Sequence, residues 1–101
     1  MIDYLVEKNL DNSDFGMLEL ERGLGMSRSQ IFRKIKALTD KSPTLFIRSI
    51  RLQYARHLLK TSHLSVSEIG YATGFSSPQF FSDVFLEEFG MRPSAMRQSE
   101  G

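Results

Sequence analysis

The sequence predicts an all-helical fold of seven helices, in which two similar three-helix units flank a long central helix. Apolar residues recur every three or four positions along the chain of 101 residues, which is the spacing of one face of a helix. Serine stands where several of these segments begin, and glycine or proline where they end. The two halves of the chain also share one pattern of residues. No strand is expected.

The second half of the chain repeats the first at an offset of 49 residues. Each copy has an apolar residue, a turn glycine, a serine, a glutamine and then an apolar pair. A helix, a turn glycine and a second, capped helix form the pattern of a helix-turn-helix, so two such units are expected. The repeat pairs Leu20 with Ile69, Gly25 with Gly74, Ser27 with Ser76, Gln30 with Gln79, Ile31 with Phe80, Phe32 with Phe81 and Ile35 with Val84.

Helices account for nearly the whole chain, and turn-rich or glycine-containing stretches separate them. The two units are expected over residues 1–42 and 61–98, the connecting helix over 43–60 and a frayed tail over 99–101. The seven helices are expected over residues 2–9, 17–22, 27–38, 43–60, 65–73, 76–89 and 93–97. The glycines at 23 to 25 are expected to stop the second of them.

Four helix starts carry a capping serine. In three of them a glutamine or glutamate follows three residues later and completes a capping box. Before the long helix, Pro43 takes the first helical position, where its missing N–H costs nothing. The capping serines are Ser27, Ser42, Ser65 and Ser76.

Aromatic residues at helical spacing are expected to pack in the core and not to stack on bases. The third helix is expected to bury Ile31, Phe32, Ile35 and Leu38. The sixth is expected to bury Phe80, Phe81, Val84, Phe85 and Phe89.

The net charge of +1 hides an uneven distribution. Residues 1–21 carry −5, residues 22–60 carry +9 and residues 61–101 carry −3. The basic charge therefore belongs to the first helix-turn-helix and the long helix, which is the electrostatic footprint of a nucleic-acid partner.

Catalytic and metal-binding groups are not clustered in the sequence. Without cysteine the chain has no disulfides or thiolate metal sites, and His57 and His63 stand apart from any acidic cluster. Neither an enzyme nor a cofactor or metal is expected. No apolar run approaches the ~18 residues that span a membrane, so no membrane contact is expected; the missing cysteines fit a reducing cytoplasm.

The third helix is expected to read DNA, because a helix-turn-helix places its second helix in the major groove. Arg33 can bond to both O6 and N7 of guanine, whereas Ser29 and Gln30 can read adenine or thymine edges. Long cations without a fixed partner suit phosphates better. The phosphate candidates in this half are Ser27, Arg28, Lys34, Lys36, Arg48 and Arg51.

The sixth helix is expected to bind DNA more weakly. Ser77 and Gln79 are base-reading candidates, and Ser76 and Ser82 are phosphate candidates. Gln79 has an alternative role as the capping-box partner of Ser76. Acidic residues on the same helix would repel a phosphate backbone; they are Asp83, Glu87 and Glu88.

The sequence resembles the AraC/XylS family of transcription regulators. The resemblance lies in residues 65–70, 73–78, Phe81, Phe85, 89–90 and 93–94, with agreement at 25–30, 32–34, 36–39, 42–43, 51–52, Ala55 and 58–59. It implies a seven-helix DNA-binding domain of two homeodomain-like units, whose recognition helices enter adjacent major-groove sites of one double-stranded operator. It places Ser29, Gln30 and Arg33 in the first recognition helix and Pro78, Gln79 and Asp83 in the second.

Family members usually carry a separate sensing or dimerisation domain. The first expected helix begins almost at Met1, so that domain is not expected within residues 1–101. The resemblance therefore implies the C-terminal output domain of a larger bacterial regulator, similar to those of hybrid two-component regulators. The family leans toward activation, and RNA polymerase as a partner is implied by the resemblance alone.

The leading hypothesis is sequence-specific binding of double-stranded DNA to regulate transcription in the cytoplasm. The acidic residues of the sixth helix replace a run that is usually basic in the family. They support a second hypothesis, a helical protein-interaction module with weak DNA affinity whose acidic face meets a basic partner.

Overall fold

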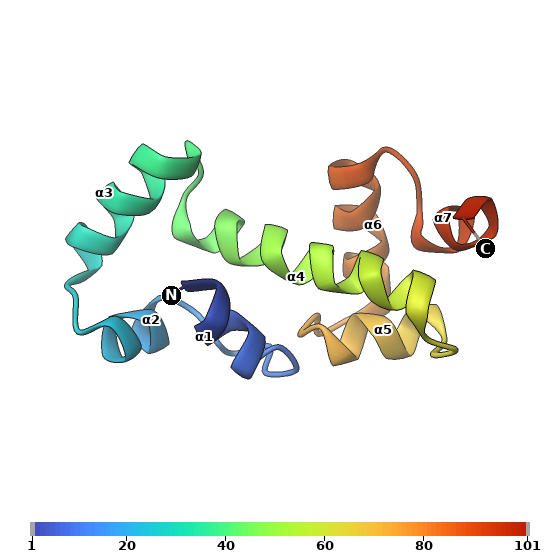
Figure 1. Cartoon of the computed structure of the whole chain (residues 1–101), viewed down its shortest axis with the longest axis horizontal. Helices are drawn as coiled ribbons and strands as arrows, with labels where there is room; N and C mark the ends of the chain where they lie inside the picture. The colour runs from blue at the N-terminus through green and yellow to red at the C-terminus, as the bar shows by residue number, and fades with distance from the viewer. Residues whose placement is uncertain (1, 101) are drawn as a thin grey trace.

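The long helix α4 (Pro43–Thr61) is the central element of the fold, with α1–α3 around one end and α5–α7 around the other (Figure 1). The computed structural model describes residues 2–100, which form seven helices and contain no strand, as predicted. The other helices are α1 (Ile2–Lys8), α2 (Met17–Leu24), α3 (Arg28–Thr39), α5 (Val66–Ala72), α6 (Pro78–Phe89) and α7 (Pro93–Glu100).

The helix α4 contributes to two hydrophobic cores. It starts where Ser42 Oγ accepts the backbone N–H of Leu45 at 3.3 Å, with proline at its first position. Its 19 residues span about 28 Å at ~1.5 Å per residue. Ile47 packs into the core of α1–α3, whereas residues one to three turns further on pack into the core of α5–α7: Leu52, Ala55 and Leu59.

The first core is made by α1, α2, α3 and the start of α4. It buries Val6, Phe15, Leu20, Ile31, Ile35 and Ile47. The helix α2 ends at Leu24, two residues after the predicted end, and Gly25 caps it with a φ of +64°. A Cβ atom at Gly23 would lie 2.9 Å from Leu5 Cδ1. The glycine therefore lets α1 pack closely on α2.

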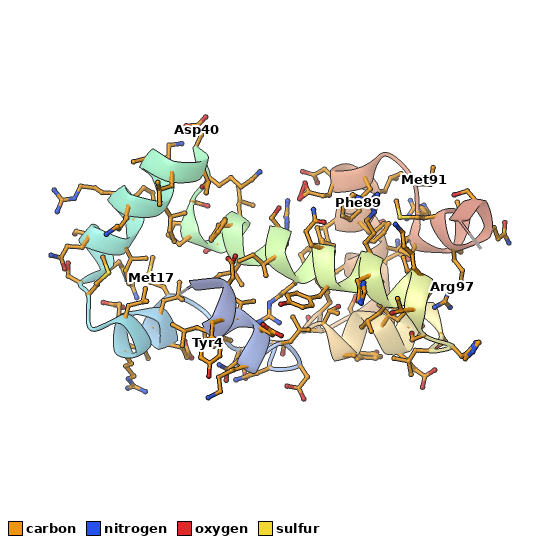
Figure 2. The ribbon with its side chains drawn as sticks, in the orientation of Figure 1. Tyr4, Met17, Asp40, Phe89, Met91 and Arg97 are labelled. Carbon is orange, nitrogen blue, oxygen red and sulfur yellow. The ribbon has the colours of Figure 1, made fainter. Side chains whose placement is uncertain are left out.

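The second core is built around phenylalanine side chains of α6. Phe81 lies 5.1 Å from Phe75 and 5.7 Å from Phe85 between ring centroids, and Phe85 lies 4.6 Å from Phe89. Phe89 lies near the C-terminal end of α6 (Figure 2), and the guanidinium of Arg56 of α4 lies 5.4 Å from the centroid of its ring. These pairs at 4.5–7 Å are the geometry that aromatic rings prefer, and they confirm that these four rings are packing residues.

The last helix closes the second unit through Arg97, whose side chain points from α7 toward the end of α4 (Figure 2). Its guanidinium donates to the backbone carbonyls of Leu59 at 3.2 Å, Ser62 at 3.3 Å and Leu64 at 2.6 Å. The helix extends to residue 100, so the tail predicted at 99–101 is wrong for Ser99 and Glu100. Residue 101 lies outside the described residues.

Both capping boxes predicted at Ser27 and Ser65 are confirmed. Ser27 Oγ accepts the N–H of Gln30 at 3.2 Å, and Gln30 Oε1 accepts the N–H of Ser27 at 2.9 Å. Ser65 and Glu68 make the same two bonds at 3.1 and 2.9 Å. These bonds stabilise the carboxylate of Glu68 and lower its pKa.

The cap of α6 is Ser77 and not Ser76. Ser77 Oγ accepts the N–H of Phe80 at 3.0 Å, and Gln79 takes no part in a capping box. The turn of the second unit thus has one more residue than the first: two residues, Phe75 and Ser76, separate the turn glycine from the cap, where the first unit has Met26 alone. The repeat offset is 49 up to the turn glycines and 50 within the second helices: Arg28–Thr39 corresponds to Pro78–Phe89.

The one-residue shift changes which side chains are buried. On a helix, one residue corresponds to a rotation of about 100°. Ile31 and Ile35 are buried at the positions of Phe81 and Phe85, whereas Phe80 is 48% exposed, contrary to the prediction. On α3, the predicted burial of Phe32 and Leu38 is also wrong: their side chains are 46% and 76% exposed.

The two units are joined by the buried guanidinium of Arg51, in the middle of α4. Its Nη2 donates to the carbonyl of Asn12 at 2.8 Å, and its Nη1 donates to Leu10 and, at 3.0 Å, to Thr73. Two of these carbonyls belong to the loop after α1 and the third to the end of α5. Burial lowers the pKa of Arg51, and the carboxylate of Asp11 opposes that effect.

Replacing Arg51 with methionine keeps the apolar stem and removes every donor. The free energy of unfolding is expected to fall by roughly 2–4 kcal/mol, because a buried carbonyl left without a donor costs about 1–3 kcal/mol and the bond to Thr73 is buried, whereas those to Leu10 and Asn12 are partly buried and cost less. Urea denaturation followed by circular dichroism measures the change. The control, Arg22→Ala, removes an exposed arginine of α2 and is expected to change stability by less than ~0.5 kcal/mol. Equal urea midpoints for Arg51→Met and the wild type would show that the bridge contributes nothing.

Gly74 and Gly25 provide a matched pair of substitutions. Both have positive φ, +92° and +64°, so alanine at either position is strained by about 1–2 kcal/mol. A Cβ atom at Gly74 would lie 1.6 Å from Arg51 Nη1, whereas nothing lies within 4 Å of one at Gly25. Gly74→Ala is therefore expected to lower the thermal midpoint clearly more than Gly25→Ala. Equal midpoints would contradict the close approach of Arg51 to this turn.

Candidate nucleic-acid interface

The exposed side of α3 is set by the two residues that it buries. Ile31 and Ile35 face the first core, so side chains about 180° around the helix face outward. Ser29 and Arg33 take these positions and are exposed. The turn at Gly25 and the cap at Ser27 fix where this helix begins.

Arg33 and Lys34 have no ion-pair partner within the part of the chain that the structure describes. The other two cations of α3 have weak intramolecular partners. Arg28 lies 3.4 Å from the carboxylate of Glu21, and Lys36 lies 3.5 Å from that of Asp40, the residue that ends α3 (Figure 2). Exposed pairs of this kind contribute at most about 1 kcal/mol, so a phosphate can replace the carboxylate.

Two predicted DNA contacts, Ser27 and Gln30, form the cap of α3 and use some of their hydrogen-bonding groups there. Ser27 Oγ accepts a backbone N–H, and Gln30 Oε1 accepts the N–H of Ser27. The amide N–H groups of Gln30 have no bond among the described residues, so this side chain keeps only its donors for a base edge.

The polar side chains of α6 bond to one another and to Arg92. Gln79 Nε2 donates to Asp83 Oδ1 at 3.0 Å. Arg92 Nη1 donates to the same oxygen at 3.1 Å and to Ser82 Oγ at 2.9 Å. With the offset of 50, Asp83 takes the position of Arg33 and Gln79 that of Ser29. The second unit thus presents an acid where the first presents an unpaired arginine.

The two glutamates near the end of α6 are held by α4. Arg48 Nη2 lies 3.6 Å from Glu87 Oε1, and Ser49 Oγ donates to Glu88 Oε1 at 2.7 Å. These contacts occupy Arg48, one of the predicted phosphate contacts, and reduce the acidic charge of α6. They also fix α6 against the half of α4 that belongs to the first core.

Arg51 is not available to a phosphate, so its prediction as a phosphate contact is wrong. The side chain is 5% exposed and its guanidinium bonds to three backbone carbonyls. Ser77 Oγ caps α6, and Ser76 is exposed beside it. The structure therefore places Ser29 and Arg33 together on one exposed face of α3 and leaves Lys34 exposed on another side of that helix, whereas Gln79 and Ser82 are engaged within the second unit.

Arg92, which donates to Ser82 and Asp83 of α6, was not among the contact residues predicted from the sequence. It follows the left-handed Gly90, whose φ is +79°, and precedes Pro93 at the start of α7. The signal was present, because Arg92 is one of only two basic residues in the acidic last segment 61–101. Within residues 2–100 the structure contains no group of acidic, histidine or cysteine residues that could hold a metal, and no helix there could cross a membrane.

A family model described as a helix-turn-helix domain matches residues 20–99. Among curated proteins, the chain is 43% identical over 90 residues to histidine kinase P4 of Formosa agariphila, covering 89% of this chain and 7% of that protein. It is 38% identical over 73 residues to the transcriptional activator RhaS of Escherichia coli, covering 72% of this chain and 26% of that protein. The chain thus spans only a small part of the length of these relatives.

Solved structures agree with the sequence relatives. The DNA-binding domain of the global transcriptional factor AdpA, in complex with a target DNA, has a TM-score of 0.85 and 30% identity over 97% of this chain and 86% of that chain. The C-terminal domain of AraT, a response regulator from Geobacillus stearothermophilus, has a TM-score of 0.85 and 25% identity over 96% and 80% of the two chains. With two helix-turn-helix units on a shared long helix, the chain belongs to the AraC/XylS family of transcription regulators and is a DNA-binding domain of that family.

Proposed function

We propose that this domain binds a specific double-stranded DNA operator mainly through α3, and so regulates transcription. Arg33 carries the proposal. It is exposed, has no ion pair among the described residues and lies opposite the buried side of a capped helix that follows a turn. A planar guanidinium in that place can bond to both major-groove acceptors of a guanine.

Ser29 and Gln30 are the other proposed base contacts of α3. Ser29 lies one turn before Arg33, and residues four apart on a helix lie about 5–6 Å from each other. Gln30 offers its amide donors. Arg28, Lys34 and Lys36 are proposed phosphate contacts, and Ser27 and Arg48 contribute less because the cap and Glu87 occupy them.

The second unit, within residues 61–98, is proposed to bind an adjacent major-groove site with lower affinity than the first unit, within 1–42. Gln79 and Ser82 must exchange internal hydrogen bonds before they reach DNA, and Ser77 is occupied by its cap. Ser76 is the phosphate candidate here with no side-chain bond among the described residues. Arg92 can move from Asp83 to a phosphate, since both partners are exposed.

The whole protein is proposed to be a larger bacterial regulator, in which a separate domain receives the signal. The similarity to a histidine kinase and to a response-regulator domain supports a two-component system. The similarity to the transcriptional activator RhaS supports activation. RNA polymerase is proposed as a further partner, and the cytoplasm as the location. The alternative of a helical protein-interaction module with weak DNA affinity is not favoured, because a similar domain is described in complex with its target DNA.

Changing Arg33 tests the base-reading role of α3. Arg33→Ala is expected to weaken binding to a selected operator by about 1–3 kcal/mol and to relax the preference at one base pair. Arg33→Lys keeps the charge and removes the planar fork, so it is expected to lose the same base preference. Fluorescence anisotropy with operators that differ at single base pairs measures both effects.

The control for Arg33 is Lys8→Ala, which removes one positive charge from α1, where Lys8 lies 5.3 Å from the ring of Tyr4. It is expected to leave the base preference unchanged. If Arg33→Ala keeps both affinity and base preference, α3 does not read bases through this residue.

Changing Lys34 tests the phosphate contacts separately. Lys34→Ala is expected to lower the slope of log K against log salt concentration by about 0.9, the value for one phosphate contact, without altering the order of preferred sequences. Binding measured at four or five salt concentrations gives the slope. An unchanged slope would remove Lys34 from the interface.

A further inference from the structure

We propose that Phe32 is also a base-reading residue, which recognises the 5-methyl group of one thymine in the operator. The proposal rests on the proposed DNA binding by α3. Phe32 was expected in the hydrophobic core, but its large apolar side chain lies at the surface. The proposal gives this exposed side chain a role.

The exposure of Phe32 is the first observation. Its ring is 46% exposed, although Ile31 before it and Ile35 after it are both 1% exposed. The exposed part of this phenylalanine keeps apolar area in contact with water. Burying that area would stabilise the protein by about 25 cal/mol per Å². The first core is closed without it.

The neighbours of Phe32 are the second observation. Arg28 and Ser29 lie one turn before it, Arg33 follows it, and these four residues line one open surface hollow. Phe32 therefore lies between the proposed phosphate contact and the proposed base contacts. A DNA duplex bound by Arg28 and Arg33 would cover the ring and remove it from water.

The second unit has a different residue at this position, which is the third observation. With the offset of 50, Phe32 corresponds to Ser82, whose hydroxyl accepts a hydrogen bond from Arg92. The aromatic ring is therefore not needed to build this kind of helix-turn-helix. It is a property of the first recognition helix alone.

Thymine is the base that this ring can select. A phenyl ring has no hydrogen-bond donor or acceptor with which to read the polar groups of adenine, guanine or cytosine in the major groove. Thymine presents a methyl group there, and apolar side chains recognise it by contact. Contact between the Phe32 ring and the thymine methyl group removes apolar area of both from water. A charged phosphate has no such apolar area to bury against the ring.

Replacing thymine with deoxyuridine tests the proposal because it removes only the methyl group. Each thymine in the half-site of the first unit is replaced in turn, in synthetic DNA without methylated cytosine. One replacement is expected to raise the dissociation constant of the wild type by about fourfold, the amount that corresponds to burying one methyl-sized group. For Phe32→Ala that replacement is expected to make no difference, and for Phe32→Leu most of the effect is expected to remain.

Each variant is compared with itself on two DNAs, so a change in its folded fraction cancels in the ratio. If every deoxyuridine operator binds the wild type like its thymine parent, or if Phe32→Ala keeps the wild-type ratio, the role of Phe32 is wrong. Loss of base preference in Arg33→Ala in the same experiment would still support the proposed function. Equal binding of all DNA sequences by the wild type would overturn both.

Discussion

The arrangement of the two units depends on one buried guanidinium. Arg51 leaves the middle of α4 and bonds to carbonyls in the loop after α1 and at the end of α5, segments about 60 residues apart in the chain. A lysine could not satisfy these acceptors in the same way, because its ammonium is a single centre without the planar fork. The glycine at 74 leaves the space that the guanidinium occupies. The two recognition helices are held by this bridge together with the contacts of Arg48 and Ser49 to α6.

The internal pairing of charges changes the meaning of the acidic second unit. From the sequence, Asp83, Glu87 and Glu88 were expected to repel a phosphate backbone. In the structure each of them accepts a hydrogen bond or lies beside an arginine, and two of these partners come from α4. The same acids thereby help to set the position of α6. The sequence identified these residues as acidic. It could not show that they interact with other side chains of the same protein, because some of their partners lie far away in the chain.

Local signals predicted most of the fold, whereas contacts between distant segments decided the exceptions. Caps and a first-turn proline lie within three residues of the helix starts they control, so Ser27, Ser42 and Ser65 were read correctly. Either Ser76 or Ser77 can cap α6 on local grounds, and in the structure the hydroxyl that accepts the N–H of Phe80 is that of Ser77. Arg51 was read as a surface cation because arginine is seldom buried, and its three acceptors come from residues 10, 12 and 73. The outward position of Arg33 followed from helical periodicity, but the exposure of Phe32 depended on where the first core ends.

Because both cores share α4, the two units are held at a fixed separation. This affects how the weaker DNA contact proposed for α6 contributes to binding. In the proposed complex, α3 bound to DNA holds α6 near the neighbouring groove, so the contact of α6 would be intramolecular and would benefit from a high effective concentration. This gain needs no strong base reading by the second unit. It requires only that the spacing in the DNA match the fixed separation of the two helices, since a rigid connector cannot stretch to reach a displaced site. Under the proposed mode of binding, the length of α4 makes the distance between two half-sites part of what the domain recognises.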